Sequence, residues 1–178
     1  SKKIPLFKYF KQVARQLNTK INVVGFGSGS GFFAYELYEA FPELIEQVYL
    51  VDIGYDESEL LETAGKPIQK LHSIPTGLSN CIVIMMDVLE HIENDQAVLQ
   101  DIHDKVGENS FYFITVPAFM SVWSAHDVYL GHYRRYTLPT LTKLLNACSC
   151  KIDQKYYIYG AIFPLVWAVR RIKRNEEN

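Results

Sequence analysis

Three histidines and one aspartate stand out as side chains that could accept a proton near neutral pH. They are His91, His126, Asp127 and His132. An imidazole or carboxylate within hydrogen-bond reach of a hydroxyl can act as its general base. His91 follows a buried apolar run, and the other three fall in a long segment without a predicted helix or strand. We therefore predict these four residues as the catalytic candidates.

The same long segment, residues 117–136, carries aromatic and cationic side chains suited to holding a substrate. Trp123 and Tyr133 would supply apolar surface, and Arg134 and Arg135 could bind a carboxylate or phosphate. Loops of this length inside a compact domain are often functional. We expect the segment to form an acceptor pocket and lid, with surface ion pairing as the alternative role of the arginines.

Residues 23–33, VVGFGSGSGFF, place four glycines at alternate positions between a β-branched run and a helical pattern. A strand, a glycine-rich turn and a helix let backbone N–H groups approach a small ligand. The dinucleotide pattern G-x-G-x-x-G does not fit, because its third glycine would be Ser30 or Phe32. The phosphate-binding loop G-x-x-x-x-G-K-[ST] is excluded, because no Lys-Ser or Lys-Thr follows.

The elements that must position these residues alternate between strands and helices. Apolar runs predict strands at 21–26, 47–53, 67–72, 80–86, 110–116 and 151–159. Periodic patterns predict helices at 5–17, 31–40, 57–65, 94–106 and 137–148. This alternation is typical of an α/β fold, a mostly parallel twisted sheet with helices on both faces. Ligands of such sheets bind beyond the carboxyl ends of the strands. The loops that begin at Gly25, Asp52, His72, Asp87 and Pro117 are therefore expected to form the site.

Two further segments carry a resemblance to a known family. IMMDVLEHIEND, residues 84–95, resembles the fourth-strand motif of class I S-adenosylmethionine-dependent methyltransferases, which include quinone-biosynthesis O-methyltransferases. Residues 114–137 resemble a small bacterial branch of that superfamily, with W-S-x-H-D and G-H-x-R-R-Y segments. The resemblance spans residues 20–165. It implies a Rossmann-like fold that transfers a methyl group from S-adenosylmethionine to a small or lipid-linked acceptor, with oxygen as the expected atom.

The resemblance also implies a cofactor site. The glycine loop would cradle the methionine end of the ligand, and Asp52 would accept hydrogen bonds from both ribose hydroxyls through its two oxygens. The predicted cofactor-binding residues are Gly25, Gly27, Ser28, Gly29, Asp52, Ile53, His72, Met86 and Asp87.

The sequence departs from the family pattern at three places, one of which has Gly107, Glu108 and Asn109 instead of the usual P-G-G before the fifth strand. Family members usually carry an acid at the position of Gly25, where it anchors the loop and the ligand's ammonium, and often another at Cys81. Loss of one charged hydrogen bond costs about 1.5–3 kcal/mol, roughly 10- to 150-fold in binding, unless Asp87 or water compensates. These departures motivate an alternative, a catalytically degenerate sensor or scaffold that binds the nucleoside. The glycine spacing and the D-V-L-E-H-I segment disfavour a nucleotide-dependent oxidoreductase.

Asp87, Glu90 and His91 lie at positions i, i+3 and i+4, on one face if this turn is helical. In some related methyltransferases a similar acid-x-x-Glu-His cluster holds a divalent metal, which two carboxylates and an imidazole can do. The alternative is that these are acids favoured at a helix start by its dipole. We predict no metal ligands.

Length and composition limit the remaining possibilities. A chain of 178 residues, 48% apolar and 21% charged, predicts one globular domain over residues 1–178. The net charge of −2 argues against broad nucleic-acid binding, which needs a basic face. The partner that the resemblance implies is the small or lipid-linked acceptor, and nucleic acid is not expected as a partner.

The number of cysteines and the length of the apolar runs indicate in which cellular compartment the protein is expected. Three cysteines, Cys81, Cys148 and Cys150, do not suggest a disulfide framework, and Cys81 reads as a buried thiol in a strand. We see no signal peptide and no run long enough to span a membrane, so a cytoplasmic protein is expected. The apolar segment with a basic end at 161–174 could contact a membrane surface peripherally, although a last helix packed on the sheet is favoured.

Overall fold

The computed structural model describes residues 2–62, 65–107, 109–158, 160, 163 and 167. The chain forms two compact units, each discontinuous in sequence. The sheet unit comprises residues 1–88 and 99–115, and the helical unit comprises residues 89–98 and 116–178. The assignment of one domain with a lid at 117–136 stays a prediction.

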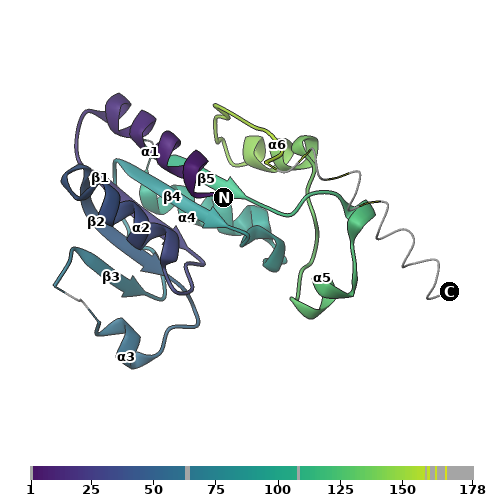
Figure 1. Cartoon of the computed structure of the whole chain (residues 1–178), viewed down its shortest axis with the longest axis horizontal. Helices are drawn as coiled ribbons and strands as arrows, with labels where there is room; N and C mark the ends of the chain where they lie inside the picture. The colour runs from purple at the N-terminus through teal and green to yellow at the C-terminus, as the bar shows by residue number, and fades with distance from the viewer. Residues whose placement is uncertain are drawn as a thin grey trace. The chain divides into compact units, whose positions relative to one another are not determined.

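The sheet unit contains a parallel sheet of five strands in the order β3-β2-β1-β4-β5 (Figure 1). The strands are β1 (Ile21–Phe26), β2 (Ile45–Val51), β3 (Ile68–Leu71), β4 (Cys81–Met86) and β5 (Phe111–Thr115). All except β2 lie within their predicted ranges, and β2 starts and ends two residues early. The α/β fold class is confirmed.

Helices cover both faces of this sheet (Figure 1). They are α1 (Lys3–Leu17), α2 (Phe32–Ala40), the short α3 (Glu57–Leu60) and the part of α4 (Asp95–Val106) that follows Val98. On one face, Phe10 of α1 and Leu37 of α2 share an apolar cluster with Val23 and Ile82 of the sheet. Strand side chains alternate between faces. Neighbouring strand residues such as Val24 therefore point to the opposite face, where α4 lies.

The register of the sheet aligns the ends of its three central strands. Phe26 of β1 lies opposite Val51 of β2, and Gly25 of β1 lies opposite Ile84 of β4. Because all strands are parallel, the loops that follow β1, β2 and β4 leave the same edge at the same level. This edge holds the predicted cofactor residues.

The helical unit is built from short helices. They are the 3-10 turns η2 (Leu89–His91) and η3 (Met120–Val122), the first residues of α4, α5 (Ala125–Tyr129) and α6 (Leu138–Ala147). The predicted helix at 137–148 is confirmed as α6, with Thr137 as its N-cap. The side-chain oxygens of Thr137 and Thr140 accept each other's backbone N–H groups, which fixes where α6 begins.

The predicted strand at 151–159 is wrong for residues 151–158, which form neither strand nor helix. A strand exists only where another strand edge pairs with it. Here Lys155 Nζ instead donates to Thr142 Oγ1 (3.2 Å), and the N–H of Leu138 donates to the Tyr157 hydroxyl (3.1 Å). The segment is therefore held against α6 by side-chain contacts.

The apolar segment proposed for membrane contact, residues 161–174, lies outside the described residues apart from residues 163 and 167. Within the described parts of the chain, no helix has both the length and the apolar character needed to cross a bilayer.

Candidate active site

The loop after β1 turns through three glycines in the left-handed region. Their φ angles are 61° at Gly27, 48° at Gly29 and 73° at Gly31, values that strain residues with a Cβ. A Cβ at Gly27 would lie 2.7 Å from both γ-carbons of Val88, whereas nothing lies within 4 Å of such an atom at Gly29. Gly27 therefore lets the loop pack tightly, and Gly29 leaves open space beside the backbone.

Asp52 ties this glycine loop to the loop after β2. Its Oδ2 accepts the N–H of Gly29 (2.8 Å), and its Oδ1 accepts the N–H of Gly54 (2.9 Å). The second bond turns the backbone away from the strand, which explains why β2 ends at Val51. Each carboxylate oxygen can accept a further hydrogen bond. Asp52 therefore keeps acceptor capacity for a ligand while it fixes the loop.

Tyr55 supports the glycine loop, although the sequence analysis did not select it. Its hydroxyl donates to the carbonyl of Gly29 (2.7 Å) and accepts from the hydroxyl of Ser28 (2.8 Å). The ring is buried, and this burial raises the pKa of Tyr55, so the hydroxyl stays a donor. The sequence feature that could have identified Tyr55 is its position three residues after Asp52, the acid that follows β2.

Gly25 lies within β1, and the space above it is filled. A Cβ there would meet the Cβ of Ser28 at 3.2 Å and a methyl group of Leu50 at 3.4 Å. The position therefore lacks both the usual acid and the room for a longer side chain without local adjustment. Loop anchoring falls instead to Asp52 and Tyr55.

Asp87 follows β4 and carries a charge pair that the sequence analysis missed. It adopts a left-handed backbone, with φ of 57°. One carboxylate oxygen pairs with the ammonium of Lys2, and the other accepts from the hydroxyl of Thr115 (3.1 Å). A cation and an anion thus stand together at the end of β4. Lys2 was hidden from sequence reasoning because it lies 85 residues from Asp87.

The remaining predicted cofactor residues also lie at this sheet edge. Ile53 is 91% exposed, which is unusual for an apolar side chain of its size. His72 follows β3, and its Nε2 lies 2.8 Å from the carbonyl of Tyr55, so it braces the loop after β2. Met86 closes β4, with its sulfur 3.8 Å from the Thr115 hydroxyl.

In the helical unit, Asp127 is the centre of a buried polar network. Its Oδ1 accepts from Arg135 Nε (2.7 Å) and lies 3.0 Å from His132 Nδ1. Its Oδ2 accepts from the backbone N–H of Ser124 (2.9 Å). Burial alone would raise the pKa of Asp127, but the bonds from Arg135, Ser124 and His132 outweigh it and hold the pKa far below its usual range. Asp127 is therefore a carboxylate that orients His132.

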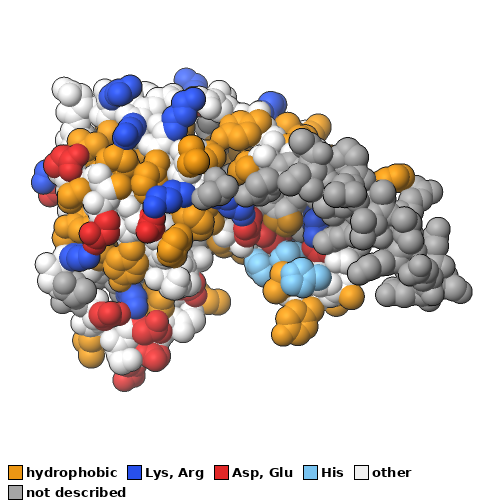
Figure 2. All heavy atoms as spheres, in the orientation of Figure 1, with side chains coloured by type: hydrophobic (Ala, Val, Ile, Leu, Met, Phe, Trp, Pro, Cys, Tyr) orange, Lys and Arg blue, Asp and Glu red, His pale blue; other side chains and the backbone are white. Residues whose placement is uncertain are grey.

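His132 lies beside His91, a predicted catalytic residue, and beside Glu90. Its ring meets the ring of His91 edge to face, with centroids 4.6 Å apart. Donor atoms of Glu90, His91 and His132 all lie within 4.8 Å of one another. Figure 2 shows histidine side chains exposed on the visible face, near apolar side chains. We call Glu90, His91 and His132 the histidine cluster.

Both predicted substrate-binding arginines already have acidic partners. Arg134 pairs with Asp95 (2.6 Å) and donates to the carbonyl of Glu93 (2.6 Å), and Arg135 pairs with Asp127. A substrate anion would therefore have to share these guanidinium groups. Their role in substrate binding remains a prediction.

The other predicted residues of this segment differ in position. The ring of Trp123 lies 6.5 Å from that of His132, centroid to centroid. Tyr133 is 52% exposed, and His126 is exposed on α5. The contact between the rings of Trp123 and His132 places Trp123 beside the histidine cluster.

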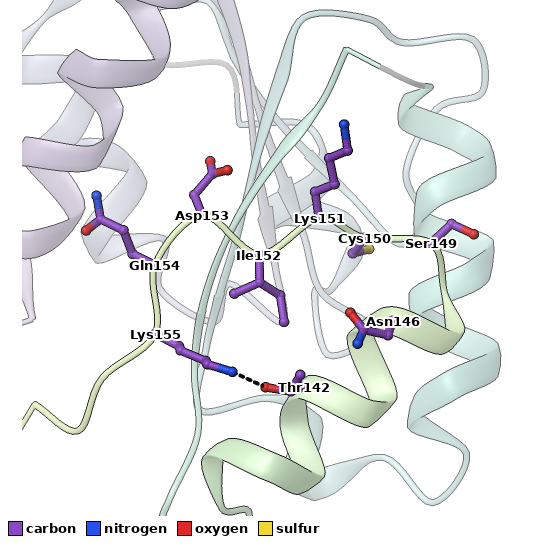
Figure 3. A pocket seen from close by; sticks show the side chains of 9 residues that line it. All are labelled: Thr142, Asn146, Ser149, Cys150, Lys151, Ile152, Asp153, Gln154 and Lys155. Atoms are coloured by element: carbon purple, nitrogen blue, oxygen red, sulfur yellow. Dashed lines mark hydrogen bonds between the residues drawn. The ribbon is translucent and has the colours of Figure 1, made fainter.

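A separate open cavity of about 560 Å³ lies between α6 and the segment that follows it (Figure 3). Its lining includes Asn146, Cys150, Ile152 and Lys155, and the bond from Lys155 to Thr142 crosses it. None of the predicted site residues lines this cavity, so it does not enter the candidate site.

Comparisons with known proteins bear on these features. Residues 5–155 match a family described as a methyltransferase domain. None of the curated proteins matches the chain. Among solved structures, the chain is similar to the methyltransferase bound to the Haloferax volcanii Trm112 methyltransferase activator. That match has 14% identity and a TM-score of 0.58, over 78% of this chain and 65% of the other.

Two further solved chains are similar at comparable levels. A pericyclic reaction enzyme matches at 18% identity and a TM-score of 0.57, over 73% of this chain and 37% of its own. A chain of the Pnkp1/Rnl/Hen1 RNA repair complex matches at 13% identity and a TM-score of 0.56, over 82% and 34%. At these identities the likeness shows the fold. The chain spans less than two thirds of each of these solved chains.

Proposed function

Because the chain belongs to the methyltransferase-domain family, as the resemblance in its sequence predicted, we propose that it transfers the methyl group of S-adenosylmethionine to an oxygen of a small or lipid-linked acceptor. The observation that carries this proposal is the hydrogen bond between Gly29 and Asp52. It joins the glycine loop to the strand-end acid, so that backbone and carboxylate can contact one ligand together.

In this proposal the nucleoside binds at the end of β2. Asp52 accepts hydrogen bonds from the ribose hydroxyls with the acceptor capacity that Gly29 and Gly54 leave unused. Ile53, which is 91% exposed, offers apolar surface to the adenine ring. Burial of such a side chain by a ligand contributes about 1.5–3 kcal/mol.

We assign the methionine end to the charge pair after β4. The amino-acid end of the cofactor carries an ammonium and a carboxylate. Asp87 can accept from the ammonium, and the ammonium of Lys2 can pair with the carboxylate. Asp87 would then replace the acid that is absent at Gly25.

Methyl transfer is an in-line displacement, in which the acceptor oxygen forms a bond to the methyl carbon as the carbon–sulfur bond breaks. The hydroxyl proton goes to a general base. His132 is the base that the geometry favours, because a neutral imidazole that donates from Nδ1 to Asp127 presents Nε2 as an acceptor. We assign Asp127 a positioning role, and keep His91 and His126 as further candidates with Trp123 and Tyr133 as acceptor contacts.

The proposal is tested by calorimetric titration with S-adenosylmethionine and S-adenosylhomocysteine, with NAD as the negative control. We expect micromolar binding of the first two and none of NAD. Asp87→Asn is expected to weaken binding about 10- to 150-fold, the cost of one charged hydrogen bond. Asp104→Asn, on the exposed side of α4, serves as the matched control and should bind like the wild type.

The outcomes separate the proposal from its alternative. Absence of binding to a folded protein would overturn the proposal. Binding without methyl transfer to any acceptor in a screen would favour the degenerate sensor or scaffold, an alternative supported by the filled space above Gly25.

A further inference from the structure

The end of α5 exposes three consecutive apolar side chains. Val128 is 65% exposed, Tyr129 86% and Leu130 41%. We call these three residues the apolar tip. At the place where Figure 1 labels α5, Figure 2 shows hydrophobic side chains beside the histidines. Single exposed apolar residues are ordinary in folded proteins, but a contiguous exposed group marks an interaction surface.

The segment that carries the tip has no exposed Lys, Arg, Asp or Glu. Residues 117–133 contain no Lys or Arg, although 21% of the chain is charged. Their one acid is Asp127, which is buried and paired with Arg135. A charged group that leaves water without a partner carries a large desolvation cost. Because Asp127 is turned inward, the tip can leave water without that cost.

The backbone of the tip is also prepared for an apolar environment. The N–H groups of residues 130–132 all donate within the turn, to carbonyls three to five residues earlier, at N···O distances of 2.9–3.0 Å. A backbone donor without a partner is costly in a protein core and in a lipid bilayer alike. These donors are already paired, so the tip can be buried without rearrangement of its main chain.

The base of α5 is fixed by the bonds of Asp127. Its Oδ2 accepts the N–H of Ser124 (2.9 Å), and its Oδ1 accepts from Arg135 Nε (2.7 Å). Arg135 Nη1 also donates to the carbonyl of Ala118 (3.2 Å). These bonds tie α5 to the segments before and after it. An element that is ordered before it docks loses less conformational entropy on docking than a disordered loop.

The size of the tip distinguishes between possible occupants. A stable interface between two proteins, including two copies of one chain, buries about 800 Å² on each partner. Even if each side chain of the tip were as large as an aromatic one, their exposed fractions would present at most about 500 Å². A bilayer imposes no such minimum, because each apolar side chain that enters it contributes separately. A tyrosine, with an apolar ring and a polar hydroxyl, suits the boundary between headgroups and acyl chains.

We propose that the apolar tip docks on the surface of a lipid bilayer, with its three side chains inserted at the boundary between headgroups and acyl chains. The contact is apolar, so it requires no anionic lipid. The tip is distinct from residues 161–174, the segment for which the sequence suggested peripheral membrane contact.

Docking does not require methyl transfer, but it has a consequence for the substrate that rests on the proposed function. His132, the base assigned above, follows the tip by one residue, Gly131. A docked tip would therefore hold this base at the membrane surface. That position favours a lipid-linked acceptor over a small soluble one.

The test is co-sedimentation of the full chain with vesicles of phosphatidylcholine alone. We expect the wild type to bind, and to stay bound at high salt, because the contact is apolar. Val128→Ser and Tyr129→Ser are each expected to weaken binding at least 10-fold, through the loss of one inserted side chain. Leu61→Ser, at an apolar residue of the sheet unit that is 81% exposed, is the matched control and should bind like the wild type.

A tryptophan at the tip measures insertion directly. Brominated acyl chains quench tryptophan fluorescence on contact. We expect vesicles of brominated phosphatidylcholine to quench Val128→Trp more strongly than the wild type, and Leu61→Trp no more than the wild type. Near-ultraviolet circular dichroism establishes that each variant is folded. Equal quenching in all three proteins would contradict insertion of the tip.

Other occupants of the tip give different results. A wild type that does not bind the vesicles, or tip variants that bind them unchanged, would overturn the proposal. Self-association in sedimentation velocity that Tyr129→Ser abolishes would assign the tip to a second copy of the chain, and would overturn it too.

Calorimetry with S-adenosylhomocysteine on the same samples separates this proposal from the proposed function. The tip variants should keep the wild-type affinity, because the tip is not part of the cofactor site. Vesicle binding by a protein that binds no cofactor would overturn methyl transfer alone and leave the docking surface in place.

Discussion

At the residue scale, Gly27 and Gly29 share a left-handed backbone but differ in their surroundings. Alanine at either position carries a backbone cost of about 1–3 kcal/mol. At Gly27 alone, the new Cβ would lie 2.7 Å from the γ-carbons of Val88. We expect Gly27→Ala to lose about 1–3 kcal/mol more stability than Gly29→Ala, because overpacking adds to strain.

Urea unfolding of both variants measures this difference. Val88→Ala, introduced beside Gly27→Ala, should recover most of the extra loss by removing the colliding methyl groups. Equal losses in the two glycine variants would show that the Val88 contact is not limiting.

Tyr55 allows a second prediction at this scale, since its hydroxyl is the feature of the ring that touches the glycine loop. Tyr55→Phe keeps the buried ring but leaves the carbonyl of Gly29 without its donor. We expect a loss of about 1–2 kcal/mol in unfolding free energy and weaker S-adenosylhomocysteine binding by calorimetry. Tyr129→Phe, at a side chain that is 86% exposed, is the control. An unchanged affinity in Tyr55→Phe would remove Tyr55 from the cradle.

At the element scale, local sequence patterns predicted most of the sheet unit. The run CIVIMM became β4 with five consecutive buried residues, as a strand covered on both faces requires. The segment at 151–158, KIDQKYYI, carries isoleucine and tyrosine residues that are favoured in strands but forms no strand, because pairing depends on a partner that composition does not reveal. β2 ended early because Asp52 closes a turn through its side chain.

The candidate site, like the sheet, could be predicted from local sequence only where no distant contact was involved. The glycine loop and Asp52 could be found from sequence because parallel strands deliver their ends to one edge. Tyr55 donates a hydrogen bond to Gly29, which lies 26 residues away in the sequence, and Lys2 pairs with Asp87, which lies 85 residues away. The proximity of Glu90 to His132 likewise arises from folding of the helical unit. Such contacts follow from three-dimensional packing, which spacing along one chain cannot specify.

The start of α6 gives a prediction for an element. Thr137 and Thr140 cap each other's backbone N–H groups in this ten-residue helix, so Thr137→Ala removes an acceptor at its first turn. We expect faster amide hydrogen exchange in α6 and a loss of about 1 kcal/mol. Thr137→Ser keeps the hydroxyl and should behave like the wild type. Exchange unchanged in the alanine variant would mean that packing alone defines the helix start.

At the scale of the whole molecule, the buried thiol of Cys81 links stability to pH. Cys81 is fully buried in β4, and this burial raises its pKa to about 11. In the unfolded chain a cysteine ionises near pH 8.5. The raised pKa therefore contributes stability that is complete below that value and is lost as pH rises toward 11. The expected slope is about 1.4 kcal/mol per pH unit.

Chemical denaturation between pH 8 and 10.5 measures this effect as the difference between the wild type and Cys81→Ala. The alanine variant should be less stable at pH 8 but flatter with pH, because it has no thiol to ionise on unfolding. Parallel curves for the two proteins would show that other groups dominate the alkaline loss.

The strand order has a consequence for how the chain is made. β1 lies between β2 and β4 in the sheet, but β4 begins 55 residues after β1 ends, at Cys81 against Phe26. At about 5–20 residues per second, synthesis leaves one edge of β1 without its partner for roughly 3–11 s. An open apolar edge is a template for pairing with another chain. Insertions between β2 and β4 would lengthen this interval and should raise the fraction of newly made protein that aggregates, even where the folded protein tolerates them.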